Sequence, residues 1–310
     1  MSSRGRTAWS AALAPLLALA AFALAVGCTD EKHKSAGTQQ QAEETPEAVS
    51  NEATGEPTAD QADAEDEQRD AEGDVEAAMD PKAVEVLKRM VQSLADAQAL
   101  GVRVDEEYDA YQSDGTTLSF GKTSTLTMRR PDRLRIETTV RNGARRVSTF
   151  DGKKLTVYDS VANRFAQVEH SSDIDSLLDF LRDDVGMKLP LAPLFSTQLR
   201  ELLLDNVDSA DFIDEEQIEG VDVDHIAFNY GEGIGVQLWI PHQGQALPRR
   251  MVMTFEDARG RPQFRADFRE WKLTPDVSEK VFAFTAPEGA RSLPFILPKR
   301  TAVPQPGEGS

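Results

Sequence analysis

The 310-residue sequence has a single cysteine, Cys28, and only four histidines. One cysteine excludes an intramolecular disulfide framework. The one cluster to test as a metal site is His225 with Asp222 and Asp224. Alternate residues of a strand point to opposite faces, so Asp222 and Asp224 share a face that His225 does not. The sequence therefore predicts no metal site.

The motifs of the common catalytic sites are also absent. The chain has no G-x-S-x-G, no H-E-x-x-H and no phosphate-binding loop, the patterns that carry a nucleophile, a zinc site or a nucleotide site. We therefore predict that the protein is not an enzyme and uses no cofactor. A hydrolase with an unrecognised site is a remaining alternative.

Positive charge is scarce too. The net charge is −19, and residues 30–80 hold 17 acidic residues against three basic ones. The rest of the chain is only mildly acidic, and no basic face of the kind that binds nucleic acid is indicated. Residues 28–79 contain no aromatic residue, so this segment cannot bury enough apolar surface to offset the entropy of ordering. We predict a disordered acidic tether there, and no nucleic-acid partner.

The amino terminus has the pattern of an export signal. Arg4 and Arg6 precede an apolar run over residues 8–26, which predicts a signal peptide over residues 1–27. The run ends in Leu24-Ala25-Val26-Gly27-Cys28, which resembles the lipobox of bacterial lipoproteins. That resemblance implies that acyl chains such as palmitate are attached at Cys28. More than one chain is expected, because a single acyl chain anchors a protein only marginally. In the enterobacterial lipoprotein pattern, aspartate directly after the cysteine retains the protein at the inner membrane. This chain has Thr29 there, which favours the outer membrane. An ordinary signal peptide with an incidental cysteine is the alternative.

Beyond residue 80, the hydrophobic pattern changes between helical and strand periodicity. Asp80-Pro81 favours the start of a helix. About six alternating strands follow, including residues 123–128 and 133–140, then two short helices, then about five more strands. Such a run must curl or close to protect its edges. We predict an α+β fold over residues 80–293: an unclosed antiparallel barrel of about eleven strands with helices covering its concave face. A proline-rich tail is expected over residues 294–310.

The segment between the two sets of strands, residues 173–204, is named the lid segment here. Leucines recur in it at helical spacing, and Pro190 and Pro193 separate its two halves. A helical pair there can cover an apolar cavity. The residues predicted to contact a ligand are Leu177, Phe180, Leu181, Phe195 and Leu199. The alternative is that these side chains belong to an ordinary filled core.

Arginines cluster in the first set of strands, at positions 129, 130, 133, 135, 141, 145 and 146. Most of them alternate with apolar residues, which is typical of a solvated sheet face. A patch that meets anionic lipid headgroups or an acidic protein is the functional alternative.

Several short motifs together resemble one family. They are Phe150-Asp151-Gly152-Lys153-Lys154-Leu155, Asn163-Arg164-Phe165-Ala166, Leu238-Trp239-Ile240 before Leu247-Pro248-Arg249, and Val281-Phe282-Ala283-Phe284 before Pro287-Glu288-Gly289. In the order of its elements and in these motifs, the chain resembles the DUF2092 family of predicted periplasmic proteins, which is similar in fold to the carriers and receptors of lipoprotein localisation (LolA/LolB-like). The resemblance implies a cavity that can hold acyl chains, and it transfers no functional residue.

These observations lead to two hypotheses. The first is a lipoprotein of the cell envelope that faces the periplasm, is anchored through Cys28, and binds a lipid, a lipoprotein acyl chain or another apolar ligand. The second is a regulatory or scaffolding domain with a filled core that binds an envelope protein. The packing of the core distinguishes them, because only the first needs space for a ligand.

Overall fold

The computed structural model describes residues 79–231 and 233–298. The elements in chain order are α1 (Pro81–Ala95), β1 (Ala99–Tyr111), β2 (Thr117–Arg129), β3 (Arg133–Val140), β4 (Arg145–Phe150), β5 (Lys154–Asp159), β6 (Arg164–Glu169), α2 (Ile174–Asp183), α3 (Ala192–Phe195), α4 (Leu199–Leu204), β7 (Val207–Ile218), β8 (Val221–Tyr230), β9 (Ile234–Pro241), β10 (Arg250–Phe255), β11 (Gln263–Lys272), α5 (Glu279–Phe282) and β12 (Arg291–Pro294). Cys28, the predicted signal peptide and nearly all of the predicted tether lie outside the described residues.

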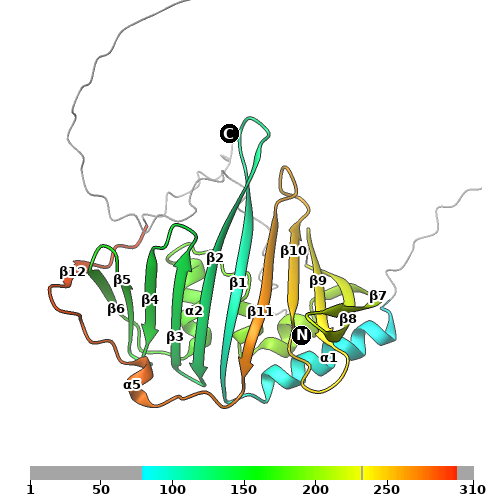
Figure 1. Ribbon diagram of the computed structural model, residues 1–310, viewed down its shortest axis with the longest axis horizontal. Coiled ribbons are helices and arrows are strands. Elements are labelled where there is room, and N and C mark those ends of the chain that lie inside the picture. The colour runs from blue at the N-terminus through cyan, green and yellow to red at the C-terminus, as the bar shows by residue number, and fades with distance from the viewer. Residues whose placement is uncertain (1–78, 232, 299–310) are drawn as a thin grey trace, which may run out of the picture. The chain divides into compact units, whose positions relative to one another are not determined.

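These strands form one sheet with the order β12-β6-β5-β4-β3-β2-β1-β11-β10-β9-β8-β7 (Figure 1). Neighbouring strands are antiparallel, except that β12 runs parallel to β6. The edge strands β12 and β7 do not pair with each other, so the barrel is unclosed. The predicted fold class is confirmed, with β12 as an additional strand. Its four residues are too few for an alternation pattern, and Pro294 argues against a strand in the sequence.

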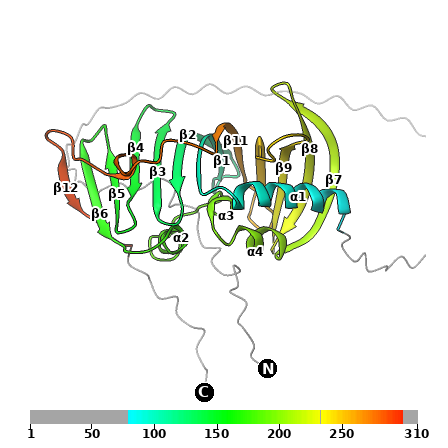
Figure 2. The same ribbon diagram turned by 90° about the horizontal axis from the view of Figure 1, so that it is seen from below.

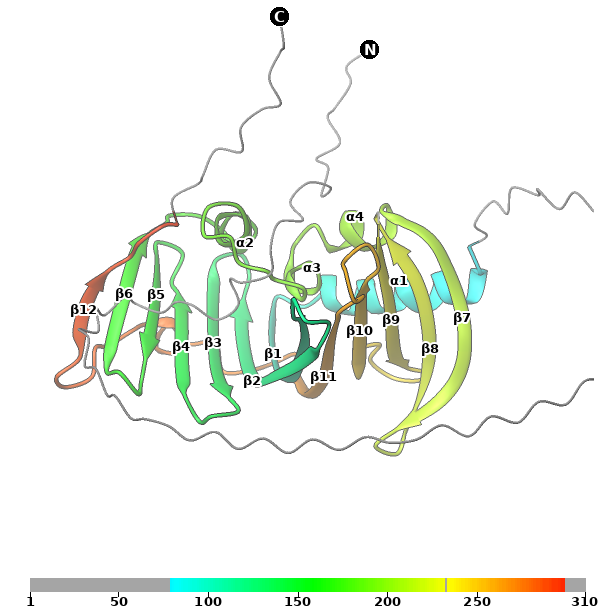
Figure 3. The same ribbon diagram turned by 90° about the horizontal axis from the view of Figure 1, so that it is seen from above.

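Helices α1 to α4 lie on the same side of the sheet, and the sheet curls toward them at its β7 end (Figures 2 and 3). Helix α1 begins where the sequence predicts, because the Asp80 carboxylate accepts a hydrogen bond from the Lys82 backbone N–H at 2.7 Å. Its apolar face, which includes Leu87, Met90 and Leu94, is buried against the sheet in the single core of the domain. Burial of such an amphipathic face supplies most of a helix's stability in a protein.

The lid segment contains three helices and not two. The long predicted first helix is α2, but the second half divides into α3 and α4. Pro193 lies inside the first turn of α3, where its missing N–H costs nothing. The prediction used Pro193 as part of a break between helices, whereas the irregular stretch occupies residues 184–191.

The outer, convex face of the sheet is covered near β2 to β6 by the segment that leads to β12. Phe282 of α5 is 1% exposed, and Phe284 packs its ring against Tyr158 and Phe165. The backbone carbonyls of Val277 and Val281 accept hydrogen bonds from arginines of β2 and β3. Residues 279–282 thus form a short helix in the stretch that alternation alone would place in extended structure.

Among the described residues, no helix has the length and apolar character needed to cross a bilayer.

Candidate ligand-binding face

The strand register arranges the concave-face side chains of β3, β4, β5, β6 and β12 in three rows. The deep row is Leu134, Phe150, Leu155 and Val168. The middle row is Ile136, Ser148, Val157, Ala166 and Leu293. The polar row is Thr138, Arg146, Asp159, Arg164 and Arg291. Successive rows are two residues apart along each strand, which is about 7 Å.

Most of the deep row is buried, most of the middle row is half-buried, and Arg146 and Arg291 of the polar row are exposed. In the deep row, Leu134, Phe150 and Leu155 are buried. In the middle row, Ile136 and Val157 are apolar yet only half-buried. The concave face therefore carries partly accessible apolar surface next to the row that contains three arginines.

Helix α2 packs over this face through a firmly held first turn. The Asp173 carboxylate accepts a hydrogen bond from the Ser176 backbone N–H at 2.9 Å, and this bond keeps the pKa of Asp173 below its usual value. The Ile174 N–H donates to the Pro131 carbonyl at 2.8 Å. Ile174 and Leu177 are buried. Farther along, Leu178, Phe180 and Leu181 are only half-buried against the core.

The end of α2 contacts the strand edge of the sheet. The Phe180 ring stacks on His170 at a centroid distance of 4.6 Å and lies 6.4 Å from the Phe295 ring. Phe295 directly follows β12. The residues just beyond the predicted domain boundary at 293 therefore contribute to the same apolar surface as α2.

The two halves of the lid segment are joined by one carboxylate. Asp175 of α2 accepts hydrogen bonds from the Ser196 hydroxyl at 2.6 Å and from the Thr197 backbone N–H at 3.0 Å. The Arg130 guanidinium adds a bond to the Phe195 carbonyl at 3.0 Å. The Asp175 bonds therefore tie the first turn of α2 to the connection between α3 and α4, and the Arg130 bond ties the end of α3 to the sheet.

The five predicted ligand contacts fall into two groups. Leu177, Phe195 and Leu199 are buried in the core. Phe180 and Leu181 are half-buried and pack against that core. All five thus contribute to one apolar cluster with the sheet, and their contact with a ligand stays a prediction.

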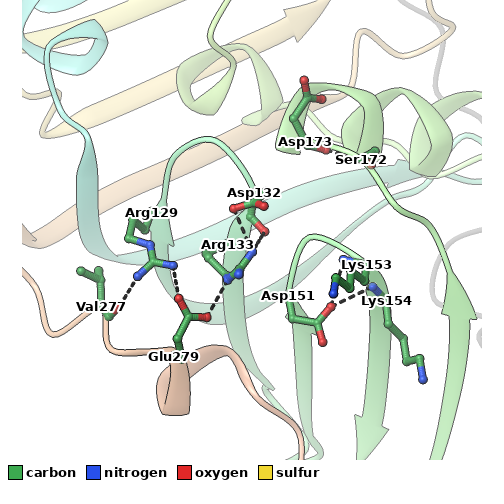
Figure 4. Close-up of polar contacts among 10 residues, drawn as sticks. All are labelled: Arg129, Asp132, Arg133, Asp151, Lys153, Lys154, Ser172, Asp173, Val277 and Glu279. Carbon is green, nitrogen blue, oxygen red and sulfur yellow. Dashed lines mark hydrogen bonds and ion pairs between the residues drawn. The ribbon is translucent and has the colours of Figure 1, made fainter.

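The motif Asp151-Gly152, which carries part of the family resemblance, holds the turns beneath α2 (Figure 4). The Asp151 carboxylate accepts hydrogen bonds from the backbone N–H groups of Lys153 and Lys154. Gly152 has φ +82°, and a Cβ atom there would lie 2.5 Å from an Asp132 carboxylate oxygen. Its carbonyl accepts a bond from the Ser172 N–H, at the entrance to α2. The motif therefore serves the architecture of the face and supplies no reactive group.

One exposed apolar feature was missed by the sequence reasoning. Strand β2 begins at Thr117, earlier than the predicted residue 123, so the β1–β2 hairpin projects beyond its neighbours (Figure 1). On its concave side, Leu118 and Phe120 are each 44% exposed, and Phe120 stacks on Tyr108 at 5.5 Å. The alternation of Leu118, Phe120 and Lys122 would have been the signal, but the threonine- and serine-rich flanks obscure it.

Strand β8, which lies at the right of Figure 1, carries a buried carboxylate, that of Asp224, which is 1% exposed. It accepts hydrogen bonds from the Arg89 guanidinium at 2.7 Å and from His242 Nδ1 at 2.8 Å. Ligating atoms of Asp224, His242 and Glu215 lie within 4.8 Å of one another. However, Arg89 already neutralises Asp224, and Lys82 pairs with Glu215 at 2.9 Å. This arrangement fits an ion-pair network better than a cation site.

The predicted separation of His225 from Asp222 and Asp224 is confirmed. Asp224 is opposite Ile240 and faces α1, whereas His225 is opposite Trp239 on the outer face. The His225 and Trp239 rings stack at a centroid distance of 4.1 Å, and His225 Nε2 lies 3.1 Å from the Gln237 amide oxygen. His225 is therefore a packed outer-face residue.

A family model described as "Predicted periplasmic protein (DUF2092)" matches residues 83–296. The comparison with curated proteins gave no match. Among solved structures, an uncharacterized conserved protein from Thermus thermophilus is similar at 13% identity and TM-score 0.39, covering 69% of this chain and 99% of that one. The Mycobacterium tuberculosis lipoprotein LppX is similar at 14% identity and TM-score 0.39, covering 64% and 100%. A LolA superfamily protein from Nitrosomonas europaea shares 11% identity at TM-score 0.30, covering 65% and 97%. At these identities and TM-scores, the likenesses support no conclusion about what this chain binds.

Proposed function

We propose that the chain, which belongs to the DUF2092 family of predicted periplasmic proteins, is a non-enzymatic binding protein of the bacterial cell envelope. It holds an acyl chain or another apolar ligand on the concave face, beneath the lid segment. The observation that carries this proposal is that apolar side chains stay half-buried both on α2, at Phe180 and Leu181, and on the concave face of the strands, at Ile136 and Val157, and that all four pack against the same core.

The energetic argument concerns the surface that a ligand would remove from water. Each methylene group of a hydrocarbon chain gains about 0.8 kcal/mol when it is fully buried. A chain between α2 and the middle row would be covered on both sides and would need few directional contacts. The segment after α2, residues 184–191, has no regular secondary structure, and Gly186 in it has φ +76°. The Asp173 cap holds the first turn of α2, and the half-buried Phe180 and Leu181 lie toward the other end of the helix.

The test replaces Leu181 with aspartate, which places a charge on the half-buried side of α2. Because an ionised carboxylate disfavours an apolar contact, Leu181→Asp is expected to lose a co-purifying lipid that native mass spectrometry detects on the unmodified full chain. The matched control is Ile213→Asp on β7, which makes the same change at a side chain that is 51% exposed. Retention of the lipid by both variants would contradict the proposed site, provided that circular dichroism shows both to be folded.

A second candidate function, partner binding by a scaffold, is favoured by the exposed hairpin. Leu118 and Phe120 offer apolar surface that nothing in the described part of the chain covers fully, and exposed aromatic residues are enriched at protein interfaces. The buried state of Leu177, Phe195 and Leu199 is also what a filled core would give. A full chain that carries no lipid in native mass spectrometry and takes up none that is added would favour this function.

The anchor is part of the proposal. Cys28, in its lipobox-like context, would carry the acyl groups, and the acidic segment would hold the domain away from the membrane, with the outer membrane as the site that Thr29 favours. Cys28→Ser is expected to move the protein from the detergent-soluble membrane fraction to the soluble periplasmic fraction, because the acylated thiol is lost. Unchanged fractionation of the variant would exclude the anchor without affecting the proposed ligand site.

A further inference from the structure

The structure separates the arginine cluster of the first strands into paired and unpaired members. Five of them form ion pairs with Glu107, Glu137 or Glu279: Arg129, Arg133, Arg135, Arg141 and Arg145. Arg130 donates to the carbonyls of Ala97 and Phe195. Arg146 has no carboxylate within 4.0 Å among the described residues. Most of the cluster is therefore the solvated or paired surface that the alternation predicts, and Arg146 is the exception.

The strand register places Arg146 in the polar row with two more arginines that have no ion-pair partner among the described residues. Arg146 is opposite Asp159, Asp159 is opposite Arg164, and Arg164 is opposite Arg291. Neighbouring strands are about 4.8 Å apart, so the backbones of Arg164 and Arg291 are separated by about that distance and those of Arg146 and Arg164 by about 10 Å. Like charges side by side on one sheet face destabilise each other. The polar row therefore carries positive charge on its arginines that no ion pair within the described part of the chain neutralises.

Two details indicate that the row is suited to an anion from outside. Asp159 comes between Arg146 and Arg164 in the strand register, but its carboxylate accepts hydrogen bonds from the backbone N–H groups of Val161 and Ala162 at 3.0 Å and makes no ion pair in the described part of the chain. The Nε atom of Arg164 is buried and has no hydrogen-bond partner. A buried donor without a partner costs free energy, which an acceptor brought by a ligand would recover.

We propose that the polar row binds the phosphate head of a lipid whose acyl chain lies along the middle row. This inference rests on the proposed function, because it places the ligand on the same concave face. Arginine presents a planar set of donors that matches phosphate oxygens in pairs. Three arginines and one aspartate leave a net charge of +2 in the row, close to the −1.5 to −2 or so of a phosphate monoester near pH 7. A carboxylate head, with one negative charge, matches the row less well.

The distance between the rows suits such an amphiphile. The polar row and the middle row are two residues apart, about 7 Å along the strands. A phosphate at Arg164 would place the first carbons of its chain over Val157 and Ile136, the half-buried residues of the middle row. The chain would then continue toward Leu181 and Phe180 of α2. One ligand would thus satisfy the unpaired charges and cover the accessible apolar surface together.

The test compares three lipids that share an oleoyl chain and differ in the head: lysophosphatidate with a phosphate monoester, oleate with a carboxylate, and monoolein without charge. The protein is the full chain in the Cys28→Ser background, so that no attached acyl group competes, and affinity is measured by titration calorimetry. Lysophosphatidate is expected to bind at least about tenfold more tightly than monoolein, as charge-assisted bonds to phosphate require. Oleate is expected to bind more weakly than lysophosphatidate.

The decisive variant is Arg146→Met with Arg164→Met, which keeps an unbranched apolar stem at both positions and removes both charges. It is expected to weaken lysophosphatidate binding at least about tenfold and to leave monoolein binding unchanged. The matched control is Arg145→Met, the adjacent residue on the opposite face of β4. Arg146 is exposed, so the single variant Arg146→Met gives the same comparison, with a smaller loss, should the double variant not fold.

The outcomes separate this inference from the proposed function. Equal affinities of the unmodified chain for lysophosphatidate and monoolein would overturn the headgroup site and leave lipid binding intact. Equal affinities for lysophosphatidate and oleate would overturn the choice of phosphate. If the arginine variants lost monoolein binding as much as lysophosphatidate binding, the arginines would be shown to stabilise the fold and not to contact the headgroup. Binding of none of the three lipids would overturn the proposed function itself.

Discussion

Phe150→Ala is expected to lower the free energy of unfolding by about 3–5 kcal/mol, the usual cost of removing a buried phenylalanine ring. Phe150 is fully buried, and in the deep row it lies between Leu134 and Leu155. Its ring also lies 6.4 Å from that of His170, which precedes α2. The backbone of β4 and its neighbours is fixed by ladder hydrogen bonds, so the sheet cannot collapse into the space that the ring leaves. The van der Waals contacts of the Phe150 ring would therefore not be replaced by other side chains.

The measurement is the midpoint and slope of denaturant unfolding of the full chain, followed by far-UV circular dichroism. The matched control is Phe120→Ala, which removes the same ring from the same concave face at a position that is 44% exposed. Its expected cost is about 1 kcal/mol or less, mainly the loss of stacking on Tyr108. Similar costs for the two variants would contradict the assignment of Phe150 to the core of the face.

Arg89→Ala is expected to destabilise the domain by about 2–3 kcal/mol, because it leaves a buried carboxylate without its main cation. Asp224 is almost inaccessible, and Arg89 of α1 is the residue that brings a permanent charge to it. Arg89 also donates to the His242 carbonyl at 3.2 Å. The bond from His242 to Asp224 remains in the variant, so the expected cost lies below that of a fully isolated buried charge.

The double variant Arg89→Ala with Asp224→Asn tests the cause. If the cost of Arg89→Ala comes from the unpaired charge, replacing the carboxylate with a neutral amide should recover part of the lost stability. The control is Lys154→Ala, which breaks the exposed pair of Lys154 with Glu169 and should cost about 1 kcal/mol or less. A double variant that is less stable than Arg89→Ala alone would show that Arg89 acts through packing of its side chain.

The sequence predicts the elements of this fold well because alternation and helical spacing are local properties. Apolar residues at every second position identified the eleven longer strands, and Asp80-Pro81 identified the start of α1. The Asn142-Gly143 pair is typical of a hairpin turn, and it lies between β3 and β4, where Gly143 has φ +85°. Elements without a periodic pattern were not found: β12 has four residues, and the helix at Glu279–Phe282 is a single turn held by Phe282 in a buried site on the outer face.

The arginines show where local pattern stops being informative. Alternation correctly indicates that Arg145 and Arg146 lie on opposite faces of β4. It cannot indicate that Glu137 lies within reach of Arg145, or that Arg164 and Arg291 share a row with Arg146, because those residues come from other strands. Arg291 in particular reaches the row only through the parallel pairing of β12 with β6, across more than a hundred residues of chain.

The sequence by itself determined the type of each long element, the order of strands and helices, and an unclosed barrel with helices over its concave face. These follow from residue spacing, which the chain carries whatever its neighbours are. Only the tertiary structure decided which apolar residues are fully buried and which are half-buried, which carboxylates have cations, and which arginines lack partners. Burial and pairing depend on the register between strands that are distant in sequence, and a shift of one residue would exchange the two faces of a strand.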